Sequence, residues 1–169
     1  AGCLAISLMG GCALLGLAPL FGFIALWIKL EDGGPILFRQ IRVGRYVREF
    51  KMLKFRSMRV DAEARLKELL AKNQHTGGVT FKIKNDPRIT RMGRFIRKYS
   101  IDELPQFWNV LKGDMSVVGP RPEMPQIVAL YTPIQRQRLC VKPGITGIWQ
   151  ISADRKNPIH ENIDYDLYY

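Results

Sequence analysis

The chain has 169 residues, with 26 Lys or Arg side chains against 15 Asp or Glu, and its net charge is +11. This length suits one domain with its own core, and so large a positive charge favours an anionic partner: nucleic acid, an acidic membrane surface or a phosphorylated substrate. The three cysteines are odd in number and include no Cys-x-x-Cys pair, so the sequence indicates neither a disulfide framework nor a zinc site.

Residues 2–28 form a long apolar stretch without a charged side chain, in which Ser7 is the only clearly polar residue. As one helix the stretch would be about 40 Å long, enough to cross a hydrocarbon core of about 30 Å. A soluble helix of that length without a polar face is unusual. The stretch therefore predicts insertion into a membrane. No basic residues precede it and no cleavage pattern ends it, which argues against a signal peptide.

Pro19 interrupts this apolar stretch. Proline removes one backbone hydrogen bond and clashes with the carbonyl four residues earlier, so we expect a kink. Residues 2–18 and 19–28 are each too short to cross a bilayer comfortably. Two arrangements stay open: one kinked spanning helix, which the residues alone slightly favour, or a re-entrant helix that returns to the same face. Basic residues follow from Lys29 onward and predict a cytoplasmic C-terminal flank.

The rest of the chain predicts an antiparallel hairpin and several amphipathic helices. Residues 35–45 and 49–58 are strand-like, with Gly44 near the join. Helices are predicted over residues 60–73, 88–98 and 100–111, and prolines indicate further helix starts at positions 122, 133 and 158. The predicted fold class is therefore α+β: mainly helical, with a small antiparallel β-hairpin, an N-terminal membrane helix and amphipathic surface helices.

Residues 100–106, Ser-Ile-Asp-Glu-Leu-Pro-Gln, place two adjacent carboxylates, Asp102 and Glu103, at the start of a predicted helix. Basic residues surround the pair, including Arg88 before it and Lys54 in the hairpin. An acidic pair among basic residues is typical of a site for a phosphorylated substrate and a divalent metal. The cations hold the phosphates, and a carboxylate ligates the metal or attacks phosphorus.

Each of these features also has a purely structural interpretation. Ser100 and Glu103 have the spacing of a capping box, and Asp102 would then only complement the helix dipole. The basic side chains of the hairpin can equally be a solvated face beside acidic lipids. The capping interpretation and the site interpretation are compatible, because a helix N-terminus also binds phosphate.

Eight stretches in chain order make the sequence resemble a known family. They are residues 34–40 (Gly-Pro-Ile-Leu-Phe-Arg-Gln), 42–44 (Arg-Val-Gly), 54–58 (Lys-Phe-Arg-Ser-Met), 86–90 (Asp-Pro-Arg-Ile-Thr), 100–106, 109–116 (Asn-Val-Leu-Lys-Gly-Asp-Met-Ser), 118–122 (Val-Gly-Pro-Arg-Pro) and 142–147 (Lys-Pro-Gly-Ile-Thr-Gly). The chain resembles the bacterial sugar transferases, the monotopic polyprenyl-phosphate phosphoglycosyltransferases that initiate O-antigen, capsule, exopolysaccharide and glycoprotein glycan synthesis.

The resemblance implies transfer of a sugar 1-phosphate from a UDP-sugar to undecaprenyl phosphate, with release of UMP and a requirement for Mg²⁺. Asp102 corresponds to the family's nucleophile, which forms a phosphosugar–enzyme intermediate. Glu103 corresponds to its partner in metal and substrate binding. Arg121, in the Pro-Arg-Pro stretch, and Arg97 correspond to the family's phosphate-binding arginines. We expect Lys54 and Arg88 to contribute to phosphate binding as well.

The resemblance also implies a place in the cell. Residues 1–30 would form a re-entrant membrane helix broken at Pro19, and residues 31–169 a single catalytic domain on the cytoplasmic face of the bacterial inner membrane. The family's usual Ser-Pro pair is Ala18-Pro19 here. Family members usually continue past this C-terminus, and larger members carry extra N-terminal transmembrane helices and a further domain.

Two other functions are weighed against this one. A metal-dependent phosphohydrolase of diphosphate substrates would use the same carboxylates and arginines but would pass the phosphate to water. A basic, membrane-associated nucleic-acid-binding protein would explain the charge but would leave Asp102 and Glu103 without a role, so we expect no nucleic-acid partner. The expected partners are a UDP-sugar, undecaprenyl phosphate and membrane lipids. The identity of the sugar and the pathway stay open, as does the oligomeric state, with a homo-oligomer as one alternative.

Overall fold

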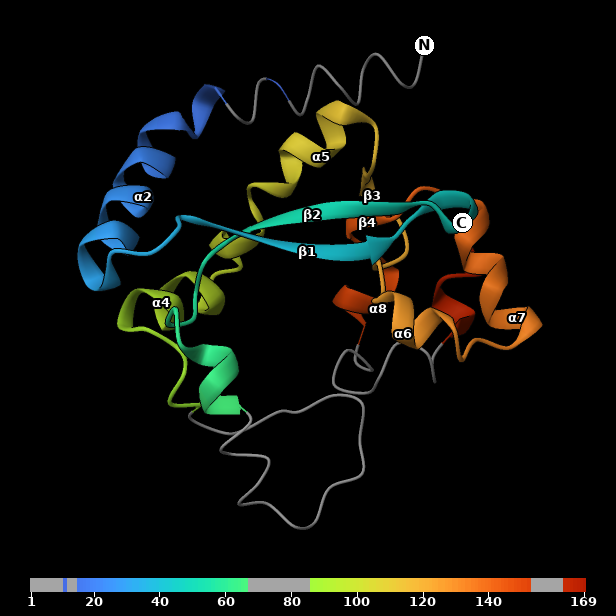
Figure 1. Cartoon of the computed structure of the whole chain (residues 1–169). Coiled ribbons are helices and arrows are strands. Elements are labelled where there is room, and N and C mark those ends of the chain that lie inside the picture. Colours follow the sequence, from blue (N-terminus) through green and yellow to red (C-terminus); the bar gives the residue numbers. More distant parts are fainter. Residues whose placement is uncertain (1–10, 12–14, 67–85, 153–162) are drawn as a thin grey trace. The chain divides into compact units, whose positions relative to one another are not determined.

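The structure is a computed structural model that describes residues 11, 15–66, 86–152 and 163–169 (Figure 1). Its helices are α2 (Ala18–Asp32), α4 (Arg91–Lys98), α5 (Gln106–Lys112), α6 (Pro125–Val128), α7 (Pro133–Arg136) and α8 (Ile148–Ile151), and its strands are β1 (Leu37–Val43), β2 (Glu49–Phe55), β3 (Ser116–Val118) and β4 (Gly144–Thr146). Short 3₁₀ turns are η1 (Arg45–Val47), η2 (Ile101–Glu103), η3 (Gln137–Cys140) and η6 (Ile163–Tyr165).

The chain divides into two compact units, each described here by itself. One comprises residues 18–38 and 54–104, and we call it the dyad unit because it contains Asp102 and Glu103. The other comprises residues 1–17, 39–53 and 105–169, and we call it the loop unit because it contains the Pro-Arg-Pro loop. The predicted antiparallel hairpin is confirmed as the β1–β2 sheet.

The core of the dyad unit joins α2, α4 and the end of β2. Ile24 and Ile28 on α2 pack with Met92 and Ile96 on α4 and with Phe55 of β2, and all five side chains are buried. Each helix supplies two residues four positions apart, the spacing that places side chains on one helical face. The amphipathic helix predicted near residues 88–98 is therefore confirmed as α4, although it begins three residues later.

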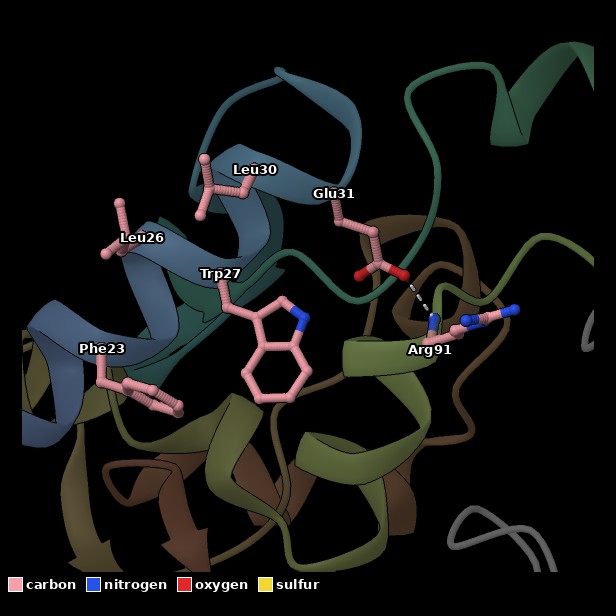
Figure 2. A pocket seen from close by; sticks show the side chains of 6 residues that line it. All are labelled: Phe23, Leu26, Trp27, Leu30, Glu31 and Arg91. Atoms are coloured by element: carbon pink, nitrogen blue, oxygen red, sulfur yellow. Dashed lines mark hydrogen bonds between the residues drawn. The ribbon is translucent and has the colours of Figure 1, made fainter.

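The opposite face of α2 is also apolar, as expected for an uncharged stretch. Phe23, Leu26, Trp27 and Leu30 are exposed, and together with two charged residues they line a cavity of about 500 Å³. Figure 2 shows Trp27 pointing from α2 toward the start of α4, where Arg91 lies. A helix that is apolar on all sides is typical of burial or of contact with lipid.

The helical backbone of the N-terminal apolar stretch is interrupted just before α2. Leu15 and Gly16 are helical, Leu17 is a turn, and α2 then begins with Pro19 in its first turn. Proline is tolerated there because the first N–H groups of a helix have no intrahelical partner. The kink expected at Pro19 stays a prediction, because Pro19 lies within the first turn of α2 and residues 1–10 and 12–14 lie outside the described residues. No helix in the described part of the chain is both long and apolar enough to cross a bilayer.

Three contacts fix the start of α4. Thr90 accepts a hydrogen bond from Gly93 N (2.9 Å), the usual N-cap bond, and the Glu31 carboxylate accepts one from Arg91 N (2.7 Å). Gly93 packs directly on the backbone at Ser57: an added Cβ would lie 1.9 Å from Ser57 O. These contacts therefore fix the position of the basic helix α4 against the segment that follows β2.

The loop unit contains two small cores and a short parallel sheet. One core gathers residues of β1, α6 and η3, and the other gathers residues of β2, α5 and β3. Strands β3 and β4 pair in parallel, with Ser116 opposite Gly144 and Val118 opposite Thr146. Asn109 of α5, 2 % exposed, donates to Lys51 O (2.9 Å) and accepts from Leu53 N (3.1 Å), which ties α5 to β2.

Several predicted boundaries are corrected by the structure. The helix expected over residues 100–111 is the 3₁₀ turn η2 followed by α5, which begins only after Pro105, because a proline N–H is missing within the expected helix. The helix expected at Pro122 begins at Pro125, whereas the start at Pro133 is confirmed, with a capping box from Thr132. Of the helix expected over residues 60–73, residues 62–66 are helical and the rest lies outside the described residues, as does the predicted start at position 158.

Candidate active site

The dyad lies in η2, directly after α4. Ser100, which precedes η2, has φ +56° and makes no capping hydrogen bond. The Glu103 carboxylate accepts a 2.7 Å hydrogen bond from Lys54 Nζ. The predicted capping box is therefore wrong, because an N-cap serine needs an extended backbone, which a left-handed residue does not have.

Asp102 is buried, with 8 % of its surface exposed. Burial raises the pKa of this carboxyl above its ordinary value, and the neighbouring Glu103 charge acts in the same direction. The positive charges of Lys54 and Arg97 act in the opposite direction and favour the ionised form. Asp102 is thus a carboxylate with little water around it and two cations close by.

Lys54 and Arg97 reach the dyad from two different elements. Lys54 is the second-to-last residue of β2, and its ion pair with Glu103 has both side chains less than one-fifth exposed. Arg97 lies in the last turn of α4, where its Nε donates to Ser57 Oγ (2.7 Å). Ser57 thereby orients the guanidinium, a role that the sequence analysis did not assign, although Ser57 belongs to the matched stretch 54–58.

Arg88 has a carboxylate partner of its own. Its Nε donates to Asp86 Oδ1 (2.8 Å), its backbone N–H donates to the same oxygen (3.0 Å), and both side chains are buried. The Arg88 guanidinium lowers the pKa of the Asp86 carboxyl, and the charge of Arg97 contributes to this shift. The pair closes the turn before α4, and a contribution of Arg88 to phosphate binding stays a prediction.

Arg121 lies in the loop unit, and its half-buried side chain belongs to a loop held by its carbonyl groups. Pro120 O accepts from Gly144 N (2.9 Å), Arg121 O from Arg138 Nη2 (2.7 Å) and Pro122 O from Arg42 Nη1 (3.2 Å). Three consecutive carbonyls therefore each have a donor on a different segment. Gly119, at the start of the loop, packs so closely against the segment leading into β4 that a Cβ would lie 2.5 Å from Lys142 O and 2.9 Å from Gly144 N.

Asp102 and Glu103 are the two carboxylates that could hold a Mg²⁺ ion together with the phosphates of a substrate. Mg²⁺ is usually bound by one or two carboxylates, several waters and the phosphates of the substrate, not by a cage of protein ligands. Among the described residues, no three His, Cys, Asp or Glu side chains cluster as a metal site. Asp102 and Glu103 are adjacent and cations surround them, as a joint site for metal and phosphate requires.

Comparison with known proteins identifies relatives over nearly the whole chain. Residues 4–169 match the family described as bacterial sugar transferase. The chain is 56 % identical over 83 % of its length to a galactosyl transferase of Streptococcus agalactiae, and 48 % identical over 85 % to an undecaprenyl-phosphate galactose phosphotransferase of Salmonella typhimurium. It is 45 % identical over 93 % to a UDP-glucose:undecaprenyl-phosphate glucose-1-phosphate transferase of Xanthomonas campestris.

The chain spans about a third of each of these relatives: 32 %, 30 % and 32 % of their lengths, respectively. The matched family nevertheless covers both the dyad unit and the loop unit, and with them the dyad and the Pro-Arg-Pro loop. The chain belongs to the bacterial sugar transferase family.

Proposed function

We propose that the chain transfers a sugar 1-phosphate from a UDP-sugar to undecaprenyl phosphate and thereby initiates a surface polysaccharide or glycoconjugate. The observation that carries the proposal is the buried Asp102 beside the Lys54–Glu103 ion pair and Arg97. Relatives whose names specify transfer of galactose or glucose phosphate to undecaprenyl phosphate support the same reaction. They differ in the sugar, so the sugar is left to experiment.

In the proposed reaction, Asp102 is the nucleophile. Its carboxylate oxygen attacks the β-phosphorus of the UDP-sugar, the bond from that phosphorus to the bridging oxygen breaks, and UMP leaves. An oxygen of undecaprenyl phosphate then attacks the same phosphorus, which releases Asp102 and forms the lipid diphosphate sugar. Partial desolvation favours attack, since a carboxylate with fewer hydrogen bonds to water is the stronger nucleophile, and nearby cations offset the approach of two anions.

Four basic residues, three from the dyad unit and Arg121 from the loop unit, would bind and orient the phosphates. Arg97, fixed by Ser57, and Arg121, fixed through its loop, present planar guanidinium groups that can each bind two phosphate oxygens. Lys54 adds a point charge and holds Glu103 in place. Arg88 is the fourth proposed phosphate ligand, although its pairing with Asp86 makes it the least available for that role.

Asp102 and Glu103 would hold Mg²⁺ together with substrate oxygens. When bound, the ion neutralises phosphate charge as a Lewis acid. Glu103 would bind the ion next to the diphosphate, and the ion pair with Lys54 would hold the Glu103 carboxylate in its present orientation.

A UMP-release assay with a panel of UDP-sugars and undecaprenyl phosphate tests the function. We expect UMP release that depends on one or a few UDP-sugars and on the lipid acceptor, with a lipid diphosphate sugar as the second product. The rival phosphohydrolase would instead release free sugar phosphate without any acceptor. Product analysis by chromatography separates the two, and hydrolysis alone would refute the transferase.

The proposed location is the inner membrane, with the site on the cytoplasmic face. We expect both ends of residues 2–28 to face the cytoplasm, because Pro19 interrupts the apolar stretch and the family has a re-entrant helix at this place. The test is labelling of a single cysteine at position 1, in a full-length chain whose Cys3, Cys12 and Cys140 have been replaced. A membrane-impermeant reagent should modify it only from the cytoplasmic side. Labelling only from the opposite side would mean that the helix spans the membrane.

A further inference from the structure

A buried cluster in the loop unit has no part in the chemistry described so far. Arg138 and Asp166 are each 3 % exposed, and Tyr131 is 6 % exposed. Arg138 Nη2 lies 2.7 Å from Asp166 Oδ2, and its Nη1 donates to the Tyr131 hydroxyl (2.6 Å). Asp166 Oδ2 accepts no aligned hydrogen bond from the described residues, so its contact with Arg138 is an ion pair.

The cluster reaches the Pro-Arg-Pro loop through one hydrogen bond. The same Nη2 atom of Arg138 that pairs with Asp166 donates to the backbone carbonyl of Arg121 (2.7 Å). Pro122 restricts Arg121, the residue before it, to extended backbone conformations, and the bond from Arg138 fixes the direction of the Arg121 carbonyl, so the backbone from which the Arg121 side chain projects is held in place. Arg138 therefore acts on the residue whose guanidinium we assign to substrate phosphate.

From this geometry we infer that Arg138 and Asp166 are positioning residues: they hold the Arg121 backbone so that its guanidinium meets the substrate phosphate. The inference rests on the proposed function only in assigning the phosphate to Arg121. Asp166 belongs to residues 163–169, so this segment takes part in orienting the Pro-Arg-Pro loop.

The free-energy cost of removing the Arg138 charge from water supports a specific role for the Arg138–Asp166 ion pair. A buried ion pair is often no better for stability than apolar residues of the same volume, and removal of one partner leaves an uncompensated charge. Burial raises the pKa of the Asp166 carboxyl and the Arg138 charge opposes that shift, while Tyr131, with its pKa raised to about 12, stays neutral near pH 7. The guanidinium thus has one anion, one hydroxyl and one carbonyl as partners, and the carbonyl belongs to Arg121.

A second contact ties the same terminal segment to the other side of the loop. Tyr169 Oη accepts a hydrogen bond from Ile148 N (2.9 Å), just after Gly147. Gly119, which begins the loop, donates its N–H to Thr146 O (2.9 Å). Residues 163–169 therefore contact both Arg138 and the first residue of α8, which follows β4 in the chain.

The test uses the full-length chain and the double variant Arg138→Met/Asp166→Leu. It removes both charges together and replaces them with apolar side chains, so stability should return toward that of the unaltered chain, in contrast to either single variant. The bond to Arg121 O remains broken, so kcat/KM for the UDP-sugar should fall about 10- to 100-fold. Arg136→Met is the matched control, because the side chain of this exposed neighbour donates its hydrogen bond to the Tyr131 carbonyl and not to Arg121 O, so the variant should keep the activity of the unaltered chain.

Amide hydrogen exchange provides a readout that does not depend on catalysis. Gly144 N–H is bonded to Pro120 O, so a loosened loop should exchange this proton faster in the double variant, and not in Arg136→Met. A chain that releases no UMP from any UDP-sugar would refute the proposed function. The exchange measurement at Gly144 would still test the positioning role in that case. Unchanged exchange at Gly144 in a folded double variant would overturn the positioning role.

A double-mutant cycle with Arg121→Lys separates positioning from general stability. If Arg138 and Asp166 act through Arg121, the double variant should cause little further loss in activity or UDP-sugar binding when Arg121 is already Lys. A loss of the same size in both backgrounds would overturn the inference. If the double variant fails to fold, Asp166→Asn replaces it, because this isosteric change keeps Arg138 in place. Asp166→Asn should give a smaller fall in kcat/KM and faster exchange of the Gly144 N–H. Normal values of both would overturn the inference.

Discussion

Asp102→Asn should fold, bind a UDP-sugar and release UMP at least about 1,000-fold more slowly than the unaltered chain, because an amide cannot act as the nucleophile. Asparagine has nearly the size of aspartate, so the buried position is filled as before. Asp61→Asn is the matched control: Asp61 lies in the same unit, is exposed and pairs with Arg65 four residues on, so UMP release should be unchanged.

The stability of Asp102→Asn distinguishes loss of chemistry from loss of fold. The pKa of Asp102 is raised in the folded chain, so the folded state binds this proton more tightly than the unfolded state does, and the ionised carboxylate destabilises the fold at neutral pH. The neutral variant should therefore melt at the same or a higher temperature than the unaltered chain at pH 7. The difference should shrink as the pH falls through the raised pKa, and disappear below about 3.9, the ordinary value for Asp.

The same shift predicts the acidic limb of the pH–rate profile. UMP release should fall as the pH is lowered through the raised pKa of Asp102, because the protonated carboxyl is not a nucleophile. Steady-state rates from about pH 4 to 8 measure this limb, corrected for any unfolding in the same buffers.

Trapping the intermediate tests the identity of the nucleophile directly. Unaltered chain incubated with UDP-sugar but no lipid acceptor should gain one sugar phosphate. Mass spectrometry of the peptide containing residues 100–106 should place it on Asp102, and Asp102→Asn should gain none. An adduct on another residue, or full UMP release by Asp102→Asn, would refute the proposed mechanism.

Arg121→Lys should lower kcat/KM for the UDP-sugar by about 100-fold, although it keeps the positive charge. A guanidinium can bind two phosphate oxygens in one plane, whereas an ammonium is a compact point charge. The loop itself should not move in this variant, since its three supporting hydrogen bonds use backbone carbonyls and not the Arg121 side chain.

Kinetics and a binding titration with UDP-sugar check this prediction. Arg136→Lys is the matched control, because Arg136 is exposed, lies in the same unit and donates its hydrogen bonds to Tyr131 O and Thr132 O and not to the carbonyls of the loop. Near-normal turnover by Arg121→Lys would remove Arg121 from the site. A large loss accompanied by a lower melting temperature would instead assign Arg121 a structural role.

The sequence by itself determined the features that depend on neighbouring residues. The i, i+4 spacing of Met92 and Ile96 predicts the buried face of α4, whereas the uniformly apolar stretch that contains Ile24 and Ile28 does not show which of its faces is buried. Thr132-Pro133 predicts a helix start that the structure confirms with a capping box. The motif order was also sufficient for the family, which the match over residues 4–169 confirms.

The local spacing of Ser100 and Glu103 was misleading, and the physical reason lies in tertiary contacts. The sequence fits a capping box, but Lys54, 49 residues away, takes the Glu103 carboxylate, and the chain turns into η2 through a left-handed Ser100. A 2.7 Å charge-assisted bond to a partly buried lysine competes well with a weak reciprocal cap at the start of a single turn.

Only the tertiary structure decided which basic side chain interacts with which carboxylate. Arg88 and Arg97 are equivalent in a count of basic residues, yet Arg88 forms hydrogen bonds with Asp86, whereas Arg97 bonds Ser57 and its charge acts on both Asp102 and Asp86. Arg138 and Asp166 lie 28 positions apart and give no sequence signal, because a buried ion pair follows no periodicity. Their partners are set by how strands and loops pack, and this packing gives the Pro-Arg-Pro loop its fixed direction.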